Sequence, residues 1–391
     1  MKKLLIFLSV LFIISALKAQ QLVSDEQPDF ANFRAWGGRC KVDLSLDMWK
    51  VDLRSCDLSK RDLSGWDKKS VLRYLSFDDE TVWPRGGQMP RWLDPQEIMD
   101  LGRTPGLNIT VLHANGITGY GVGIAIIDQG LTPHAEYQDN LVLYKNFDRN
   151  QEGSMHGAAV ASIAVGQTVG VAPEADLFYI STRFENAANG RFNAGPIADA
   201  IQEIININKT LPKGQKIAVI SISRGFSDMD NEREKFLSAV RDAKNAGIAV
   251  FTTDDVFTLS RAGYYADPDE ISSYTQTAYW GDARKFARIY AEQISVPTDY
   301  RVLASPTGFE DYVAYSDGGL SWAVPYIAGL YALAAQVDSS VTKDTFMSTA
   351  RKTAVTINLK QNGAPVKINY FVNPVNLINY FVKMQGGSAR I

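Results

Sequence analysis

Three residues of types that can catalyse acyl transfer stand at defined places along the chain: Asp128, His156 and Ser321. Asp128 ends an apolar run of strand length, whereas His156 and Ser321 each stand at the start of a helical pattern. A serine hydroxyl is a weak nucleophile until a base removes its proton, and the pKa of histidine lies close to neutral pH. An aspartate can hold the imidazole tautomer and stabilise its cation. These types predict Ser321 as nucleophile, His156 as base and Asp128 as orienting group.

Each of these residues also has a simpler structural explanation. A serine at a helix start is more often an N-cap, and an aspartate after a strand is more often a turn residue. Around Ser321, however, Gly318 and Gly319 permit a tight backbone. The free N–H groups and the positive dipole end of the helix would collect at Ser321, where they could stabilise a negative oxygen. Taken alone, Ser321 would still be assigned as an N-cap, and it is the upstream segments around Asp128 and His156 that favour the chemical role.

The elements that must position these residues alternate after Pro105. Strand patterns cover 121–127, 175–181, 217–222 and 248–253, and helix patterns cover 157–165, 196–206 and 232–245. Continuous apolar strands that alternate with helices predict an α/β fold: a mostly parallel sheet with helices on both faces. Active sites of such sheets gather at the carboxyl ends of the strands, where Asp128 and the loop after Thr253 would lie.

Four motifs in this order resemble those of the subtilisin-like serine proteases, the subtilases. They are Ile124–Gly130, His156–Ser162, Gly170–Pro173 and Gly319–Gly329, and the similarity extends from about 106 to 335. The resemblance implies a subtilisin-like fold and a serine endopeptidase that hydrolyses peptide bonds through Asp128, His156, Ser321 and an acyl-enzyme. Peptides or proteins would be the substrates. No cofactor or metal is expected, because no clear cluster of oxygen ligands for calcium is found.

The resemblance also implies a substrate-binding segment and an oxyanion region. Ser223, Arg224 and Gly225 stand where the family binds its substrate as an added strand. Arg224 is unusual there, and it either points away from the substrate or favours an acidic or polar side chain. The family asparagine of the oxyanion hole is replaced by Asp255, or by Asp254 if the turn differs by one residue. A protonated carboxyl could donate a hydrogen bond to the oxyanion, whereas an ionised one would repel it.

Two alternatives to an active peptidase are open. Leu320 replaces the family threonine before the nucleophile, and together with Asp255 it would suit a catalytically weak or inactive subtilase-fold module that binds peptides. The intact triad argues for the enzyme. The second alternative is an adhesion or partner surface on the N-terminal repeats described below.

The composition is that of an ordinary globular protein. The 391 residues are 46% hydrophobic and 21% charged, with a formal net charge of −3. This charge balance favours neither nucleic acid nor an anionic membrane as partner.

Residues 1–19 have the pattern of a secretory signal peptide. Lys2 and Lys3 precede the apolar run 4–17, which closes near Ala19. The alternative is an uncleaved membrane anchor, for which the run is short. We expect an exported protein, secreted or periplasmic, with no stable membrane span after cleavage.

Residues 20–105 are expected to form a small N-terminal region of unknown role, before a peptidase domain over 106–391. Leu53, Leu58 and Leu63 recur with period five and would share one face. The segments 75–77 and 81–83 suggest a short strand pair or an extended arm. Cys40 and Cys56 leave two alternatives open, one disulfide or two unpaired thiols. Residues 254–300 are expected to be a surface excursion, with a helix over 283–292.

Overall fold

A computed structural model describes most of the chain. The described residues are 22, 24–31, 40–42, 51–148, 152–184, 186, 188–275, 293–361 and 364–387. The expected signal peptide over 1–19 and the expected helix over 283–292 lie outside them.

A parallel five-stranded sheet lies at the centre of the fold, with the strand order β5-β6-β4-β7-β8. Its strands are β4 (Gly123–Asp128), β5 (Leu141–Asn146), β6 (Asp176–Ser181), β7 (Ile217–Ile222) and β8 (Ala249–Phe251). In the parallel register Asp128 lies opposite Ser181, and Ile127 lies opposite Ile222. The carboxyl ends of these strands therefore meet at one edge, as the alternating pattern predicts.

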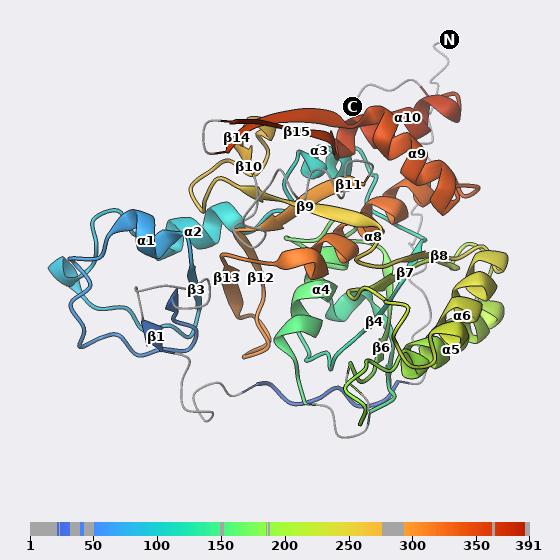
Figure 1. Ribbon diagram of the computed structural model, residues 1–391, viewed down its shortest axis with the longest axis horizontal. Helices are drawn as coiled ribbons and strands as arrows, with labels where there is room; N and C mark the ends of the chain where they lie inside the picture. The colour runs from blue at the N-terminus through green and yellow to red at the C-terminus, as the bar shows by residue number, and fades with distance from the viewer. Residues whose placement is uncertain are drawn as a thin grey trace, which may run out of the picture.

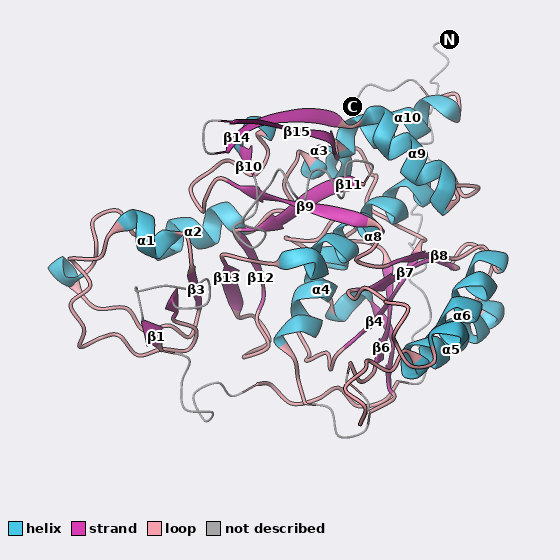
Figure 2. Cartoon of the chain, in the orientation of Figure 1, coloured by secondary structure: helices cyan, strands magenta, loops and turns pink. Residues whose placement is uncertain are grey.

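Helices cover both faces of this sheet, which confirms the expected α/β architecture (Figures 1 and 2). Helices α5 (Gly195–Thr210) and α6 (Arg233–Asn245) pack together on one face, and α4 (Met155–Val165) and α8 (Gly319–Val337) pack together on the other. Small residues allow the close contact on the second face. A side chain at Gly329 would meet the Val171 side chain at 2.6 Å.

A second sheet corrects the expectation of a surface excursion over 254–300. It has the order β10-β9-β11-β15-β14, and β9 and β11 are buried along their whole length. Its strands are β9 (Val256–Arg261), β10 (Tyr274–Thr275), β11 (Ile294–Asp299), β14 (Val355–Gln361) and β15 (Ala364–Phe371). Several buried positions of β9 and β11 carry Thr, Ser or Asp, and this interrupts the apolar pattern by which a strand is recognised.

The third sheet joins the N-terminal region to the rest of the protein (Figure 1). Its order is β1-β2-β3-β13-β12, with β1 (Lys41–Val42), β2 (Val51–Asp52), β3 (Leu75–Asp78), β12 (Arg301–Ala304) and β13 (Tyr312–Tyr315). Strand β3 pairs with β2 and β13, so the expected pairing of 75–77 with 81–83 is wrong. Instead, Val82 forms an isolated parallel bridge to Asp57.

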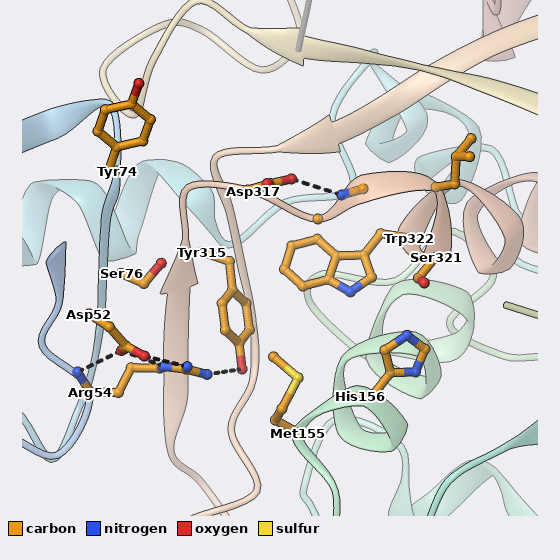
Figure 3. A pocket seen from close by; sticks show the side chains of 13 residues that line it. Asp52, Arg54, Tyr74, Ser76, Met155, His156, Tyr315, Asp317, Ser321 and Trp322 are labelled. Carbon is orange, nitrogen blue, oxygen red and sulfur yellow. Dashed lines mark hydrogen bonds and ion pairs between the residues drawn. The ribbon is translucent and has the colours of Figure 1, made fainter. Parts of the chain in front are cut away.

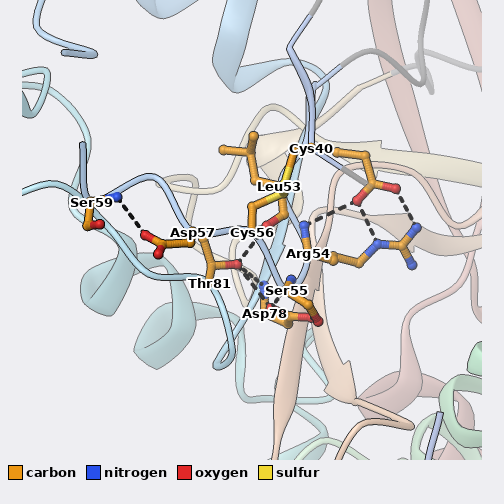
Figure 4. Close-up of a disulfide and its surroundings, with 10 residues drawn as sticks. Cys40, Leu53, Arg54, Ser55, Cys56, Asp57, Ser59, Asp78 and Thr81 are labelled. Atoms are coloured by element: carbon orange, nitrogen blue, oxygen red, sulfur yellow. Dashed lines mark hydrogen bonds and ion pairs between the residues drawn. A yellow bond between two sulfur atoms is a disulfide. The ribbon is translucent and has the colours of Figure 1, made fainter. Parts of the chain in front are cut away.

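The period-five leucines do share a buried face. Leu53, Leu58 and Leu63 are at most 2% exposed, and they lie in one hydrophobic cluster with Val302 and Ala314. Cys40 and Cys56 form a disulfide with their Cα atoms 5.5 Å apart, which decides between the two alternatives for these thiols (Figure 4). Nearby, the buried Asp78 carboxylate accepts hydrogen bonds from the Ser55 backbone and hydroxyl.

Shorter elements complete the fold. In the part of the chain that the structure describes, the remaining α-helices are α1 (Lys68–Leu72), α2 (Pro95–Gly102), α3 (Ile109–Ala114), α9 (Lys343–Thr353) and α10 (Pro374–Met384), and the 3-10 turns are Gly86–Gln88, Gln138–Asn140 and Ile271–Ser273. Among the described residues, one helix, α8, is long and apolar enough to cross a membrane, and 78% of its apolar window is buried inside the protein. This is the packing of a core helix.

Candidate active site

Asp128 is the last residue of β4 and is only 1% exposed. Its Oδ1 accepts a hydrogen bond of 2.8 Å from the backbone N–H of Gln129. The same oxygen lies 2.6 Å from His156 Nδ1. The edge of the central sheet therefore presents a buried carboxylate to one particular imidazole nitrogen.

His156 lies in the first turn of α4. Ser154 caps this helix, because its Oγ accepts a hydrogen bond of 3.1 Å from the His156 backbone N–H. Gly157 lets the helix approach the β4 loop, since a Cβ there would lie 2.6 Å from the Gly130 carbonyl oxygen. With Nδ1–H donated to Asp128, the other ring nitrogen, Nε2, is unprotonated in the neutral ring and is able to accept a proton.

The environment of His156 has opposing effects on its pKa. Burial lowers the pKa, but the negative charge of Asp128 and its hydrogen bond outweigh burial, and the net result is a pKa above 6.5. The side chain keeps 23% of its surface exposed, so a substrate can reach the ring.

Ser321 is in the first turn of α8, after the N-cap Gly318. Gly319 adopts a positive φ of 56°, which glycine tolerates and which forms the tight turn into the helix. Figure 3 shows the Ser321 hydroxyl directed toward the His156 ring. Among the described residues no hydrogen bond joins these two side chains; Ser321 Oγ instead lies 3.5 Å from the Ser223 carbonyl oxygen. Catalytic hydrogen bonds are often long without substrate, so this geometry is compatible with catalysis.

The expected substrate segment lies directly beside Ser321. Ser223 Oγ donates a hydrogen bond of 2.7 Å to the Ser321 carbonyl oxygen. The guanidinium of Arg224 lies over the Phe192 ring, 3.5 Å from its centre. Gly225 has no room for a side chain, because a Cβ would lie 2.8 Å from Thr253 Oγ1 and 2.9 Å from Asp254 Oδ1.

The two aspartates of the expected oxyanion region face different parts of the protein. Asp255 Oδ1 forms an ion pair of 2.7 Å with Lys343 of α9, and its Oδ2 accepts from the Thr252 backbone N–H. Asp254 lies over Gly225 and accepts a hydrogen bond of 3.2 Å from the Phe226 N–H. Burial raises the pKa of Asp254. Of the two positions that the sequence left open, Asp254 is the one beside the substrate segment.

Two further acidic residues, which the sequence did not single out, hold the turn before Ser321. Asp299 Oδ1 accepts from the Gly318 N–H at 3.2 Å, and Asp317 Oδ1 accepts from the Gly319 N–H at 3.0 Å. Burial, and then the negative charge of Asp317, raises the pKa of Asp299 to about 7. Burial also raises the pKa of Asp317. The pair therefore retains a proton under conditions in which an ordinary aspartate has lost it.

A cavity of about 330 Å³ opens beside Ser321 and His156 (Figure 3). One wall comes from the stretch around Ser321, including Tyr315, Asp317 and Trp322, and Met155 adds to it. The opposite wall comes from the N-terminal region and consists of Asp52, Arg54, Tyr74 and Ser76. No pattern in the sequence indicated that these distant segments would meet.

The other two histidines have structural contacts. His113 Nε2 lies 2.9 Å from the Val171 carbonyl oxygen. The Glu136 N–H donates to His134 Nδ1, so His134 carries its proton on Nε2, which donates to the Asp311 carbonyl oxygen. Burial lowers the pKa of both rings. Within the described residues, no group of three or more His, Cys, Asp or Glu could hold a metal ion.

Comparison with known proteins gives one consistent family. The protein-family model described as "Subtilase family" matches residues 119–371 of this chain. The serine protease AprX of Bacillus subtilis is 25% identical over 281 residues, which cover 60% of this chain and 61% of AprX. The thermostable alkaline protease of Halalkalibacterium halodurans is 26% identical over 259 residues, covering 63% of this chain and 66% of the relative. The chain thus covers less than two thirds of the length of either relative.

Solved structures show the same fold at lower identity. The prenylagaramide maturation protease PagA matches with a TM-score of 0.50 and 16% identity, over 72% of this chain and 99% of PagA. A chain of the subtilase cytotoxin SubAB matches with a TM-score of 0.50 and 15% identity, over 72% of this chain and 96% of its own length. At this identity the likeness concerns the fold alone.

Proposed function

This chain belongs to the subtilase family of serine proteases, and on that basis we propose that it is an exported endopeptidase that uses Asp128, His156 and Ser321. The observation that supports this most is the hydrogen bond of 2.6 Å between Asp128 and His156, with Ser321 on the same side of the cavity. Peptides or proteins are the proposed substrates.

The proposed reaction follows from these positions. His156 Nε2 takes the proton from Ser321 Oγ as the oxygen attacks the peptide carbonyl carbon, while Asp128 stabilises the imidazolium. His156 then gives the proton to the leaving nitrogen, the C–N bond breaks and an acyl-enzyme remains. Water, activated by the same imidazole, hydrolyses this ester and frees Ser321.

The oxyanion would be stabilised at the start of α8. The first N–H groups of a helix have no intrahelical partner and lie at its positive end, so the Ser321 N–H can donate to the oxyanion. We assign the second donor position to Asp254, which can donate only in its protonated form. The raised pKa of Asp254 supports this role.

The substrate would bind along Ser223, Arg224 and Gly225 as an added strand. Thr253 and Asp254 occupy the place where a side chain at Gly225 would lie, so Asp254 is directly beside the proposed substrate strand. The stacking of Arg224 on Phe192 supports the alternative in which its side chain points away from the substrate.

Export is supported by two features. Residues 1–19 have a signal-peptide pattern, and the Cys40–Cys56 disulfide suits an oxidising compartment. N-terminal sequencing of the protein recovered outside the cytoplasm tests this. A chain that begins near Gln20 is expected, and an intact Met1 on a cell-associated protein would contradict it.

Labelling with a fluorophosphonate serine probe tests the catalytic role. Wild type should be labelled and should cleave peptides, and Ser321→Ala should do neither while keeping its melting temperature. The competing hypothesis, an inactive peptide-binding module, draws on the long contact of Ser321 Oγ with Ser223 rather than with His156. Peptide binding by wild type without labelling or turnover would favour that module.

A further inference from the structure

The cavity of about 330 Å³ lies on the side of Ser321 away from the substrate segment. Ser223 contacts the Ser321 backbone directly, yet neither residues 223–226 nor Asp254 line the cavity. A peptide that crosses the nucleophile has its acyl part on one side and its leaving part on the other. If the acyl part lies along 223–225, the leaving part enters the cavity.

The position of His156 supports the same assignment. The imidazole must protonate the leaving nitrogen, so the leaving segment has to begin next to it. His156 lines the cavity together with Met155 and Ser321. The first residue after the cleaved bond would therefore direct its side chain into this space.

The wall from the N-terminal region is fixed to the catalytic body. Strand β3 pairs with β13, and Ser76 Oγ accepts a hydrogen bond of 3.3 Å from the Ser316 N–H. Arg54 Nη1 lies 3.4 Å from Tyr315 Oη, and its guanidinium stands 5.3 Å from the centre of the Tyr315 ring. A segment held by strand pairing and a buried arginine is part of the site and not a loose cover.

The chemistry of the walls indicates which side chain would fit. Tyr315 and Trp322 pack edge to face with ring centres 4.8 Å apart, and Met155 and Tyr74 add further apolar surface. The charge of Arg54 is compensated by an ion pair of 2.7 Å with Asp52. The carboxyl group of Asp317 would disfavour an acidic group. The lining combines three aromatic side chains and Met155 with polar groups, of which Arg54 and Asp52 neutralise each other, and its apolar surface suits a bulky apolar side chain.

We infer that Asp52, Arg54, Tyr74 and Ser76 form the outer wall of a leaving-group subsite, which selects a bulky apolar, preferably aromatic, side chain directly after the cleaved bond. The inference rests on the proposed peptidase function. It adds that the N-terminal region takes part in substrate selection in the active enzyme.

The acyl-enzyme can react with water or with an added amine. The ratio of the two products tests the leaving-group subsite separately from the subsites that bind the acyl part of the substrate. An ethyl ester of a peptide that the enzyme cleaves forms the acyl-enzyme and releases ethanol. Water or an added amino-acid amide then attacks the ester carbonyl, His156 takes the proton of the attacking group, and Ser321 leaves with its own proton restored. The ratio of new peptide to hydrolysed acid measures how well each amide occupies the subsite.

Phenylalanine amide should capture the acyl-enzyme at least about tenfold better than glycine amide, and aspartate amide should be poorest, because a hydrophobic pocket discriminates on this scale. Tyr74→Ala should reduce the phenylalanine preference about threefold or more, and Tyr74→Phe should retain it. Tyr120→Ala removes an equally large, 41% exposed side chain that does not line the cavity, and it should change nothing.

Failure of the subsite and failure of the peptidase function give different results. Equal capture of the phenylalanine and glycine amides, or no difference between Tyr74→Ala and wild type, would overturn the subsite while leaving the peptidase intact. No ester turnover at all would overturn the peptidase function, and the subsite with it. Melting temperatures of all variants within a few degrees of wild type ensure that Tyr74→Ala reports on the cavity wall.

Discussion

Asp299 and Asp317 bind consecutive N–H groups of one turn: Asp299 accepts from Gly318, and Asp317 accepts from Gly319. Both carboxylates also have a buried Oδ2 for which the structure records no hydrogen-bond partner. Burial and the negative charge of Asp317 favour the protonated form of Asp299, so the pair is expected to hold one proton. The turn that leads to Ser321 is therefore held by a pair whose charge depends on pH.

This pair predicts a pH-dependent stability. The pKa of Asp299 is raised to about 7 in the folded protein, so the folded state binds a proton that the unfolded chain releases near pH 4. The bound proton therefore stabilises the folded state fully below about pH 4, and this contribution to the free energy of unfolding is lost as pH rises through about 7. Asp299→Asn keeps an acceptor for Gly318 but cannot ionise. Its melting temperature relative to wild type should rise by at least about 2 °C between pH 5 and pH 9. Exposed Asp100→Asn should show no such trend, and an unchanged difference for Asp299→Asn would contradict the shared proton.

A second prediction concerns the pH profile of catalysis. Only neutral His156 can act as base, so kcat/KM should fall on the acid side with an apparent pKa above 6.5. Asp128→Asn removes the charge that raises this pKa, so the His156 pKa should decrease and kcat should fall about 10⁴-fold. The chain has three histidines, so NMR titration can follow His156 even in the inactive variant. An unchanged His156 pKa in Asp128→Asn would contradict the assigned pair.

The neighbouring Asp254 and Asp255 provide a matched comparison. Asp254→Asn supplies an amide donor at every pH, so kcat/KM should increase relative to wild type as pH rises and the Asp254 carboxyl ionises; one oxyanion donor is worth about 10²- to 10³-fold. Asp255→Asn should leave the pH profile unchanged, because Asp255 pairs with Lys343. A reversed result, with the gain in Asp255→Asn, would move the oxyanion role to that residue.

The disulfide predicts a defined loss of stability. Cys40 and Cys56 are 16 positions apart, and closing a loop of about this length stabilises a protein by about 3 kcal/mol. The double variant Cys40→Ser, Cys56→Ala should lose about that much unfolding free energy. Reductant should lower the stability of wild type but not of the variant. Equal sensitivity of both proteins to reductant would contradict the assignment.

The central sheet and the positions of Asp128, His156 and Ser321 in the fold were predictable because their signals are local. A continuous apolar strand ends at Asp128, and His156 and Ser321 each stand in the first turn of an apolar helix. Strands β9 and β11 were missed because they bury polar side chains, such as Ser260 and Asp299, at 1% exposure each. A buried carboxylate is the opposite of what a hydrophobic pattern predicts.

The cavity between the N-terminal region and the stretch around Ser321 could not be predicted, for a different reason. Arg54 and Tyr315 become neighbours only when β3 pairs with β13, and their sequence separation is 261 residues. The spacing of hydrophobic residues and the amino-acid composition describe only residues that are close together in the sequence. They carry no information on which distant strands pair. The pairing of β3 with β13 decides which residues lie opposite His156 across the cavity.

The pairing of β3 with β13 also sets an order of events during synthesis. The N-terminal region emerges first, but the strand that completes its sheet, Tyr312–Tyr315, is made near the end of the chain. Contacts of such high sequence separation form slowly because the intervening loop has to close first. The edge of β3 that pairs with β13 therefore stays unpaired until most of the chain has been synthesised. We expect the wall of the cavity to be among the last parts to fold, so that an unfinished chain has no complete site.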